Sequence, residues 1–302
     1  MGLNLSGMTT ETRNPRTMQL DQMSPLEIVT VMNEEDARVP LAIAKCLPQI
    51  AQAVTWAAEA FEKGGRLFYM GAGTSGRLGV LDAAECPPTF GVPKEMVVGL
   101  IAGGEKAFIE AVEGAEDSRE LAVEDLKAHG LTANDFVVGI AASGRTPYVL
   151  GGLDYAKSVG CHTAAIACNI GSAIGKAAEL AIEVNCGPEV LTGSTRLKSG
   201  TAQKLILNMI STGSMVRTGK AYQNLMVDVQ QTNEKLHTRA ENIVIDATGV
   251  EREKACAAID AAGGSVKTAI TMLLADCDAA EAARRLEKAR GHVREAIRLE
   301  VL

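Results

Sequence analysis

The sequence has few aromatic residues and no excess of positive charge. Phe, Trp and Tyr make up 3% of the 302 residues, too few for the stacking platforms on which proteins bind single-stranded nucleic acid. Thirty lysines and arginines against 37 aspartates and glutamates give a net charge of −7, the opposite of the basic surface that binds nucleic acids and anionic membranes. We therefore expect neither a nucleic-acid nor a membrane partner.

The chain also lacks long apolar runs and patterns of metal-binding residues. No run approaches the roughly 18 residues that span a membrane, and the N-terminal segment lacks the basic-then-apolar order of a signal peptide. Seven cysteines without a C-x-x-C pair indicate reduced thiols in a cytoplasmic protein. Four histidines show no ligand spacing, so the sequence predicts no metal.

What is present is the composition of a folded chain, with 47% hydrophobic and 22% charged residues. We divide it into an N-terminal arm with helices (1–60), a central α/β domain (61–245) and a small C-terminal all-α domain (246–302). The last part is rich in Ala, Glu and Arg and carries no strand signal. It contains a repeat that relates residues 262–270 to residues 289–297.

The N-terminal part begins with a polar segment. Residues 1–22 show no hydrophobic period, so we expect an arm that becomes ordered by docking. Ser24 then predicts the N-cap of a helix, and Glu27 completes its capping box. A longer helical stretch follows, in which Pro40 and Pro48 are expected to interrupt the helix.

The central domain alternates short apolar runs with glycine-rich turns and helical patterns, which is typical of strands and helices around a parallel sheet. Five parallel strands predict a doubly wound sheet of order 2-1-3-4-5, with a ligand site at the carboxyl ends of the first and third strands. The predicted strands cover residues 67–70, 96–101, 136–140, 162–167 and 181–184, and the predicted helices cover 76–84, 106–112, 117–128, 147–159, 193–219, 221–230 and 233–242.

The turn after the first strand carries polar residues suited to an anion. Gly71, Gly73 and Gly76 have the spacing of a dinucleotide-binding fingerprint. That interpretation needs an acidic residue that closes the second strand and holds the ribose, but a diglycine stands there. The added Thr74 and Ser75 instead indicate a phosphate cradle, in which hydroxyls and the N–H groups of a helix N-terminus hold the anion.

The turn after the third strand repeats this pattern. Ser143, Gly144, Arg145 and Thr146 follow that strand, and their Ser-Gly-Arg matches residues 75–77 after the first strand. Either turn alone is equally compatible with an ordinary connection between a strand and a helix. Together they would face each other across the switch point of the sheet, which favours a sugar-phosphate or similar anion site.

Two further polar groups are weaker candidates. Ser194 and Lys198 stand at the mouth of the predicted long helix, as a cap and a cation, and a capped helix with solvated charges explains them equally well. His237 could transfer a proton, although a satisfied structural histidine is the simpler interpretation.

Two carboxylates fit acid–base chemistry. Glu85 precedes Pro87 and Pro88, which we expect to end its helix, and a helix C-terminus favours the protonated carboxyl that a general acid needs. Glu116 follows Gly114 at the start of the next helix, and a helix N-terminus stabilises the carboxylate form that suits a general base. Each acid alone is more often a solvated or capping residue, and the pair matters only if both face the same pocket.

These segments resemble a known family over nearly the whole chain. Residues 71–77 and 142–147, with the five-stranded layout, are similar to the sugar isomerase (SIS) domain. The match to the N-acetylmuramic acid 6-phosphate etherase family within it lies in residues 10–15, 33–36, 82–88, 111–117 and 193–202.

The resemblance implies a cofactor-free carbon–oxygen lyase that removes D-lactate from N-acetylmuramic acid 6-phosphate and leaves N-acetylglucosamine 6-phosphate, in the recycling of cell-wall amino sugars. It implies Glu85 as the acid and Glu116 as the base. It also implies a small-molecule sugar phosphate as ligand and a homodimer. Two alternatives remain, an aldose–ketose sugar-phosphate isomerase and a regulatory protein that senses a sugar phosphate without turnover.

Overall fold

The computed structural model describes residues 7–110, 112–231 and 233–299 and divides the chain into two compact units. The sheet unit comprises Met1–Ala84 and Glu95–Ser211, and the helical unit comprises Glu85–Lys94 and Thr212–Leu302. The sequence placed the start of the helical domain at residue 246. The structure instead assigns everything from Thr212 onward to the helical unit, because residues such as Tyr222 and Ala240 pack into its core.

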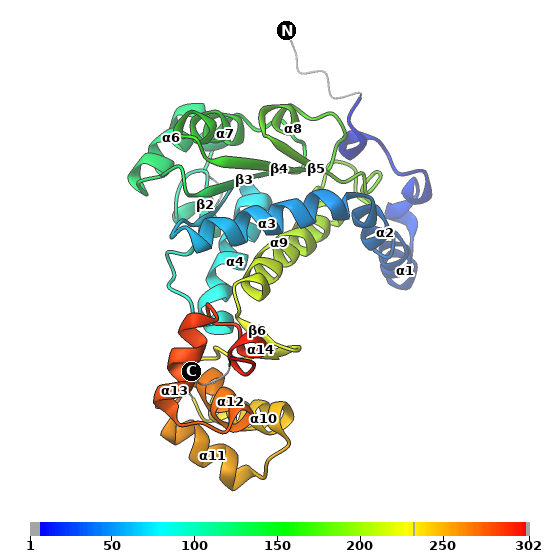
Figure 1. The fold of residues 1–302 in the computed structure, drawn as a ribbon. Helices are drawn as coiled ribbons and strands as arrows, with labels where there is room; N and C mark the ends of the chain where they lie inside the picture. Colours follow the sequence, from blue (N-terminus) through cyan, green and yellow to red (C-terminus); the bar gives the residue numbers. More distant parts are fainter. Residues whose placement is uncertain (1–6, 111, 232, 300–302) are drawn as a thin grey trace. The chain divides into compact units, whose positions relative to one another are not determined.

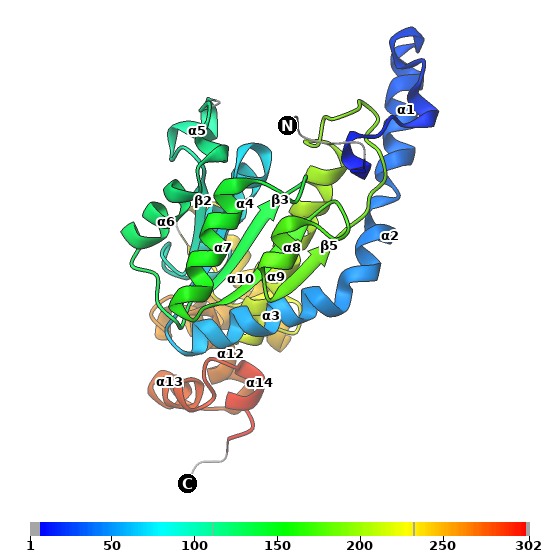
Figure 2. The ribbon, with the colours of Figure 1, turned by 90° about the horizontal axis from the view of Figure 1, so that it is seen from above.

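The sheet unit is built on five parallel strands in the order β2-β1-β3-β4-β5. Figure 2 labels β2, β3 and β5 across this sheet. The predicted sheet order is therefore confirmed, and each predicted strand is present with its ends shifted by at most one residue. The strands are β1 (Leu67–Gly71), β2 (Val97–Ile101), β3 (Phe136–Ala141), β4 (His162–Ala167) and β5 (Leu180–Glu183).

Helices surround this sheet on both faces, which explains why its central strands are apolar throughout (Figure 1). In β1, Phe68 and Met70 pack with α6 and α7, whereas the Tyr69 hydroxyl reaches the carbonyl of Leu207 on α9 at 3.4 Å. The helices that lie wholly in the sheet unit are α1 (Pro25–Asp36), α2 (Val39–Ile43), α3 (Leu47–Glu62), α5 (Lys106–Ile109), α6 (Arg119–Ala128), α7 (Pro147–Val159) and α8 (Ala173–Ala177). Two more begin in it and end in the helical unit, α4 (Gly73–Phe90) and α9 (Lys198–Arg217).

The expected helix signals near the N-terminus are confirmed. Ser24 and Glu27 form a complete capping box at the start of α1. Pro40 and Pro48 each lie in the first turn of a new helix, α2 and α3, with a 3-10 turn over Ala44–Cys46 between them. Proline lacks the N–H that a helix interior requires, so the predicted single stretch divides at these positions.

An ion pair ties the starts of the two central strands together. The guanidinium of Arg66, just before β1, donates to both carboxylate oxygens of Asp135, just before β3, at 3.1 and 2.8 Å. Burial would raise the pKa of Asp135, but the bonds from Arg66 and from the Thr132 N–H outweigh it and lower the pKa. The pair holds β1 and β3 in register at the amino end, opposite the predicted ligand site.

The first part of the helical unit differs from the prediction. The predicted helix over residues 221–230 is wrong, because β6 (Ala221–Tyr222) and β7 (Leu225–Met226) form a short antiparallel pair there. Gln223 has a φ of 54° in the two-residue connection, a geometry that tight hairpins require and helices do not allow. The next helix, α10 (Glu234–Thr248), is longer than predicted.

The repeat predicted near the C-terminus is a structural one. Helices α11 (Arg252–Ala261) and α12 (Val266–Ala275) correspond to α13 (Ala279–Lys288) and α14 (Val293–Ala296). In the first copy the Gly264 N–H donates to the carbonyl of Ile259 at 2.9 Å, and in the second the Gly291 N–H donates to that of Leu286 at 2.8 Å. In the described part of the chain, no helix combines the length and apolarity needed to cross a membrane.

The two copies differ at one left-handed position. Gly263 has a φ of 62°, and its counterpart Arg290 has a φ of 50°, where a side chain costs roughly 1–2 kcal/mol. We expect Gly263→Ala to lower the free energy of unfolding by about 1 kcal/mol, and Arg290→Gly to raise it slightly. Urea unfolding followed by circular dichroism measures both, and the same sign for the two variants would contradict this account.

Candidate active site

A pocket of about 190 Å³ lies at the carboxyl ends of β1 and β2. This is the edge of a parallel sheet at which ligands bind. Ala72 directly follows β1 and Ala102 directly follows β2, so the two strand ends form its base. The described residues that line it are Ala72, Gly73, Arg77, Ala102, Ala107, Val112, Glu113, Gly114 and Glu116.

The first wall of the pocket is the tight turn from β1 into α4. The helix begins at Gly73, earlier than predicted, so Thr74 and Ser75 lie in its first turn. A β-carbon on Gly76 would come within 2.6 Å of the Gly71 carbonyl oxygen, so only glycine allows the helix to start this close to the strand. The first-turn N–H groups lack intrahelical acceptors and are available to an anion.

The Ser75 hydroxyl is buried and already bonded. It donates to the side-chain oxygen of Gln203, on the second turn of α9, at 2.9 Å. The neighbouring Thr74 side chain contacts the same helix, because its Cγ2 lies 3.6 Å from the β-carbon position of Gly200. Sequence analysis missed Gln203, which has no local motif and meets Ser75 only through the packing of α9 against α4.

The second predicted turn leaves β3 at the same edge of the sheet. β1 and β3 are neighbours, with Gly71 opposite Ile140. Gly144 has a φ of 74°, and a β-carbon there would lie 2.4 Å from that of Ser172. The Thr146 side chain makes no capping bond at the start of α7, so its hydroxyl is not committed to the helix.

The N-terminal arm is docked against this second turn. The Asn169 side-chain amide donates to the carbonyls of Ala142 and Ser143, at 3.3 and 3.2 Å, and to the Thr10 hydroxyl at 3.1 Å. The predicted docking of the polar arm is confirmed for the residues that the structure describes, from Gly7 onward.

Glu116 lines the pocket, and Glu113 lies in it as well. Glu116 is exposed and belongs to the 3-10 helix Ala115–Asp117 that follows Gly114, whose φ is 75°. The segment from β2 to α6 thus brings two carboxylates to one pocket. The sequence analysis identified Glu116 as a candidate. It did not identify Glu113, because nothing in the sequence distinguishes Glu113 from an ordinary solvent-exposed glutamate.

Glu85 lies elsewhere on α4. The prediction that the proline pair ends its helix is wrong, because α4 continues through Pro87 and Pro88 to Phe90. The helix ends at Gly91, whose φ is 62° and whose N–H donates to the Pro87 carbonyl at 2.9 Å. Glu85 is exposed, belongs to the helical unit and does not appear among the described residues that line the pocket.

A buried carboxyl on α4 holds this helix to α9. One Asp82 oxygen accepts hydrogen bonds from the Asn208 amide at 2.6 Å and the Ser211 hydroxyl at 3.2 Å. Burial raises the pKa of Asp82, and the bonds from Asn208 and Ser211 offset only part of that effect. Together with the Ser75–Gln203 contact, this fixes α9 along the helix that starts at the pocket.

The third predicted cluster has a structural role in this fold. Lys198 is 1% exposed, and its ammonium donates to Glu35 at 2.6 Å. The predicted cap, Ser194, lies in the loop before α9 rather than at its first residue. Glu189 caps the helix instead, because its carboxylate accepts from the N–H groups of Lys198 and Ser199, both at 2.9 Å.

His237, the weaker proton-transfer candidate, is exposed on α10 and contacts the Gln231 side chain at 3.0 Å.

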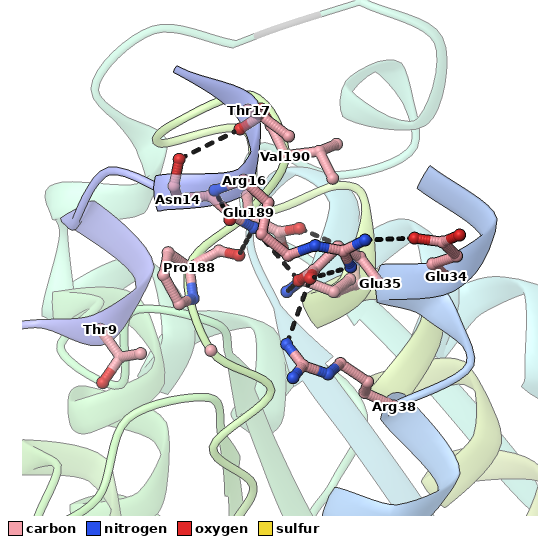
Figure 3. A network of polar contacts seen from close by, with 12 residues as sticks. Thr9, Asn14, Arg16, Thr17, Glu34, Glu35, Arg38, Pro188, Glu189 and Val190 are labelled. Carbon is pink, nitrogen blue, oxygen red and sulfur yellow. Dashed lines mark hydrogen bonds and ion pairs between the residues drawn. The ribbon is translucent and has the colours of Figure 1, made fainter. Parts of the chain in front are cut away.

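Glu35 is the centre of a network that joins the arm to α9 (Figure 3). Besides Lys198, it accepts hydrogen bonds from Arg16 at 3.0 Å, Asn14 at 3.1 Å and Arg38 at 3.2 Å. Burial would raise the pKa of Glu35, but the hydrogen bonds from Lys198 and Arg16 outweigh it and lower the pKa. The outer Glu34 also pairs with Arg16 but remains largely exposed.

Comparison with known proteins identifies relatives over almost the full chain. Residues 49–157 match the glucokinase regulatory protein N-terminal SIS domain, and residues 120–212 match the SIS domain. An N-acetylmuramic acid 6-phosphate etherase of an Exiguobacterium species is 62% identical over 293 residues, 97% of this chain and 100% of that protein. One from Serratia proteamaculans is 61% identical over 295 residues, 98% of this chain and 99% of that protein.

A solved structure supports the fold independently. The phosphoheptose isomerase from Francisella tularensis superimposes with a TM-score of 0.50 at 18% identity, over 64% of this chain and 100% of that one. At this identity the similarity concerns the fold. The SIS domain that residues 71–77 and 142–147 resemble is shown by the family match over residues 120–212.

The buried network leads to a test with a matched pair of variants. Glu35→Gln leaves the Lys198 charge buried without a counter-ion, which costs about 3–5 kcal/mol of unfolding free energy, whereas Glu34→Gln removes an exposed partner worth less than about 1 kcal/mol. Because the pKa of Glu35 is lowered, the wild type loses its advantage as the pH falls below the ordinary value of 4.5. Urea unfolding at pH 7 and pH 3.5 measures both effects, and equal losses at pH 7 would contradict this role.

Proposed function

The chain belongs to the N-acetylmuramic acid 6-phosphate etherase family, and from this we propose that it cleaves the D-lactyl ether of N-acetylmuramic acid 6-phosphate. The products are N-acetylglucosamine 6-phosphate and D-lactate, and the enzyme is a carbon–oxygen lyase of amino-sugar recycling. The observation that carries the proposal in the structure is the position of Glu116 in a pocket beside the α4 N-terminus. A base and an anion-binding turn are thus available to one small ligand.

In this proposal the two turns hold the 6-phosphate. Thr74, Ser75 and Gly76 contribute the first turn of α4, whose N–H groups and dipole favour an anion. Ser143, Gly144 and Thr146 contribute the turn from the neighbouring strand. Such local donors are needed because the protein as a whole is acidic, with a net charge of −7.

The chemistry requires a base and an acid and no redox step. In the open-chain sugar C1 is an aldehyde, which makes the proton on C2 acidic. Removal of this proton forms a carbanion, and its electron pair forms the C2–C3 double bond as the C3–O bond to lactate breaks. The departing oxygen takes up a proton. Water then adds across the double bond, with hydroxide at C3 and a proton at C2.

We assign the base to Glu116 and the acid to Glu85. Glu116 lines the pocket, which supports its role at C2. The assignment of Glu85 rests on the family resemblance of residues 82–88, and its side chain is exposed. Each such group contributes about 10²–10⁴-fold to the rate.

We also propose a homodimer in the cytoplasm. The dimer is the assembly that the family resemblance implies. The location follows from the substrate, because a sugar phosphate is permanently charged and does not cross membranes unaided.

The proposed reaction is tested by incubating the protein with N-acetylmuramic acid 6-phosphate in ¹⁸O-labelled water and weighing both products. Elimination and hydration predict D-lactate without label and one labelled oxygen on C3 of the sugar. Label in the lactate would contradict this route. Binding of the sugar phosphate without any lactate would favour the regulatory alternative, and a ketose product would favour an isomerase.

The two carboxylates are separated by a second readout, the entry of solvent deuterium at C2. We expect Glu85→Gln to lower lactate release by about 10²–10⁴-fold while deuterium still exchanges, and Glu116→Gln to stop both. Glu113→Gln is the matched control, since it removes a second carboxylate from the same pocket. If Glu113→Gln rather than Glu85→Gln has the selective effect, the acid is Glu113.

A further inference from the structure

Arg77 is the cation of the pocket that contains Glu116. It lies on α4, directly after the turn assigned to the phosphate. Its Nε donates to the carbonyl of Phe108 and its Nη2 to that of Ala107, both at 2.8 Å. These bonds hold the guanidinium against the last turn of α5 and fix its orientation.

Among the residues that the structure describes, the two bonds leave part of the guanidinium uncommitted. Arginine has five N–H donors, and the bonds to Ala107 and Phe108 use two of them. In the described part of the chain Arg77 forms no ion pair, although Glu113 and Glu116 line the same pocket. By contrast, Arg66 and Arg119 of the same unit each pair with an aspartate.

The proposed substrate carries a second anion that needs such a cation. Its lactyl group ends in a carboxylate, attached through the ether oxygen to C3. If Glu116 removes the proton from C2, the C3 substituent begins one bond away and lies in or beside the same pocket. There the lactyl carboxylate would meet the like charges of Glu113 and Glu116.

The size of the pocket agrees with one part of the substrate. Its volume of about 190 Å³ is below the roughly 300–1,000 Å³ of sites that enclose a whole ligand. We therefore assign to it only the reacting end of the sugar, with C2, C3 and the lactyl group. The phosphate would remain outside, at the α4 N-terminus.

We propose that the free donors of Arg77 bind the lactyl carboxylate, so that Arg77 selects C3 ethers that carry an acid. This inference rests on the proposed function and adds the residue that distinguishes a lactyl ether from an uncharged one. A guanidinium suits the task because its planar fork matches a carboxylate. The same contact holds the leaving group in place while its ether oxygen gains charge and takes up a proton.

The test compares the natural substrate with its lactamide, in which a neutral carboxamide of the same shape replaces the carboxylate. Values of kcat/KM for lactate or lactamide release are measured for the wild type, Arg77→Gln and Arg77→Lys. We expect the wild type to prefer the acid by roughly 10- to 100-fold, the range for a hydrogen bond to a charged group. Arg77→Gln should abolish this preference, and Arg77→Lys should retain part of it.

Arg145→Gln is the matched control, because Arg145 occupies the equivalent place in the second turn and its guanidinium contacts the Met8 sulfur at 3.8 Å. This variant should keep the preference for the acid. Thermal unfolding of each variant checks its fold, and inhibition by D-lactate in the presence of N-acetylglucosamine 6-phosphate gives a second readout that Arg77→Gln should weaken.

The outcomes separate this inference from the proposed function. If Arg77→Gln lowers kcat/KM equally for both substrates, Arg77 only supports α5 and the inference is overturned. A wild type that shows no preference also overturns it, even though the etherase function stands. If the wild type releases neither lactate nor lactamide, the proposed function itself has failed.

Discussion

The direct passage from β1 into α4 is the constraint on which the site depends. A single residue, Ala72, separates the last residue of the strand from the first of the helix. The close approach of Gly71 and Gly76 makes this possible, because a β-carbon at either position would meet backbone atoms. The helix N-terminus therefore lies at the sheet edge, with Ser75 and Arg77 on its first turns. Replacing either glycine would move both residues.

The second structural requirement is that α9 stays aligned with α4. Two polar contacts do this, the Ser75–Gln203 bond near the site and the Asp82 cluster further along. The Glu35–Lys198 pair holds the start of α9 to α1 instead. Apolar packing alone would hold the helices together without specifying their relative position. A buried ion pair adds little net stability to the folded state. Its two charges meet in only one arrangement of the helices, however, so it specifies their position. Glu35 also accepts a hydrogen bond from Arg16, which holds the N-terminal arm in place.

An acidic protein that binds an anionic sugar must place its positive charge locally. In the proposed site, the first turn of α4, the turn after β3 and the guanidinium of Arg77 would provide it. Two other cations of the sheet unit are paired with buried carboxylates, Arg66 with Asp135 and Lys198 with Glu35. Lys198 differs from Arg77 in this respect. The sequence suggested that Lys198 contacts a ligand, but in the structure its ammonium is buried and bonded to Glu35.

The sequence by itself determined the features that depend on neighbouring residues. Apolar runs bounded by glycines predicted the five strands, and the strand-helix alternation predicted their order. The repeat near the C-terminus corresponds to two helix pairs with equivalent turns at Gly264 and Gly291. These signals are local, because backbone period and turn geometry arise within a few residues. The glycine turns and Glu116 could be singled out for the same reason.

Only the tertiary structure decided which distant side chains meet. Glu35 and Lys198 are 163 residues apart, and Ser75 and Gln203 are 128 apart, so no spacing in the sequence relates them. The same holds for the cap that Glu189 provides and for the presence of Arg77 with Glu113 in the pocket of Glu116. Local sequence rules also failed to predict that α4 continues through Pro87 and Pro88. Packing of whole helices selects these partners, because a buried charge or amide takes whichever group the fold brings within reach.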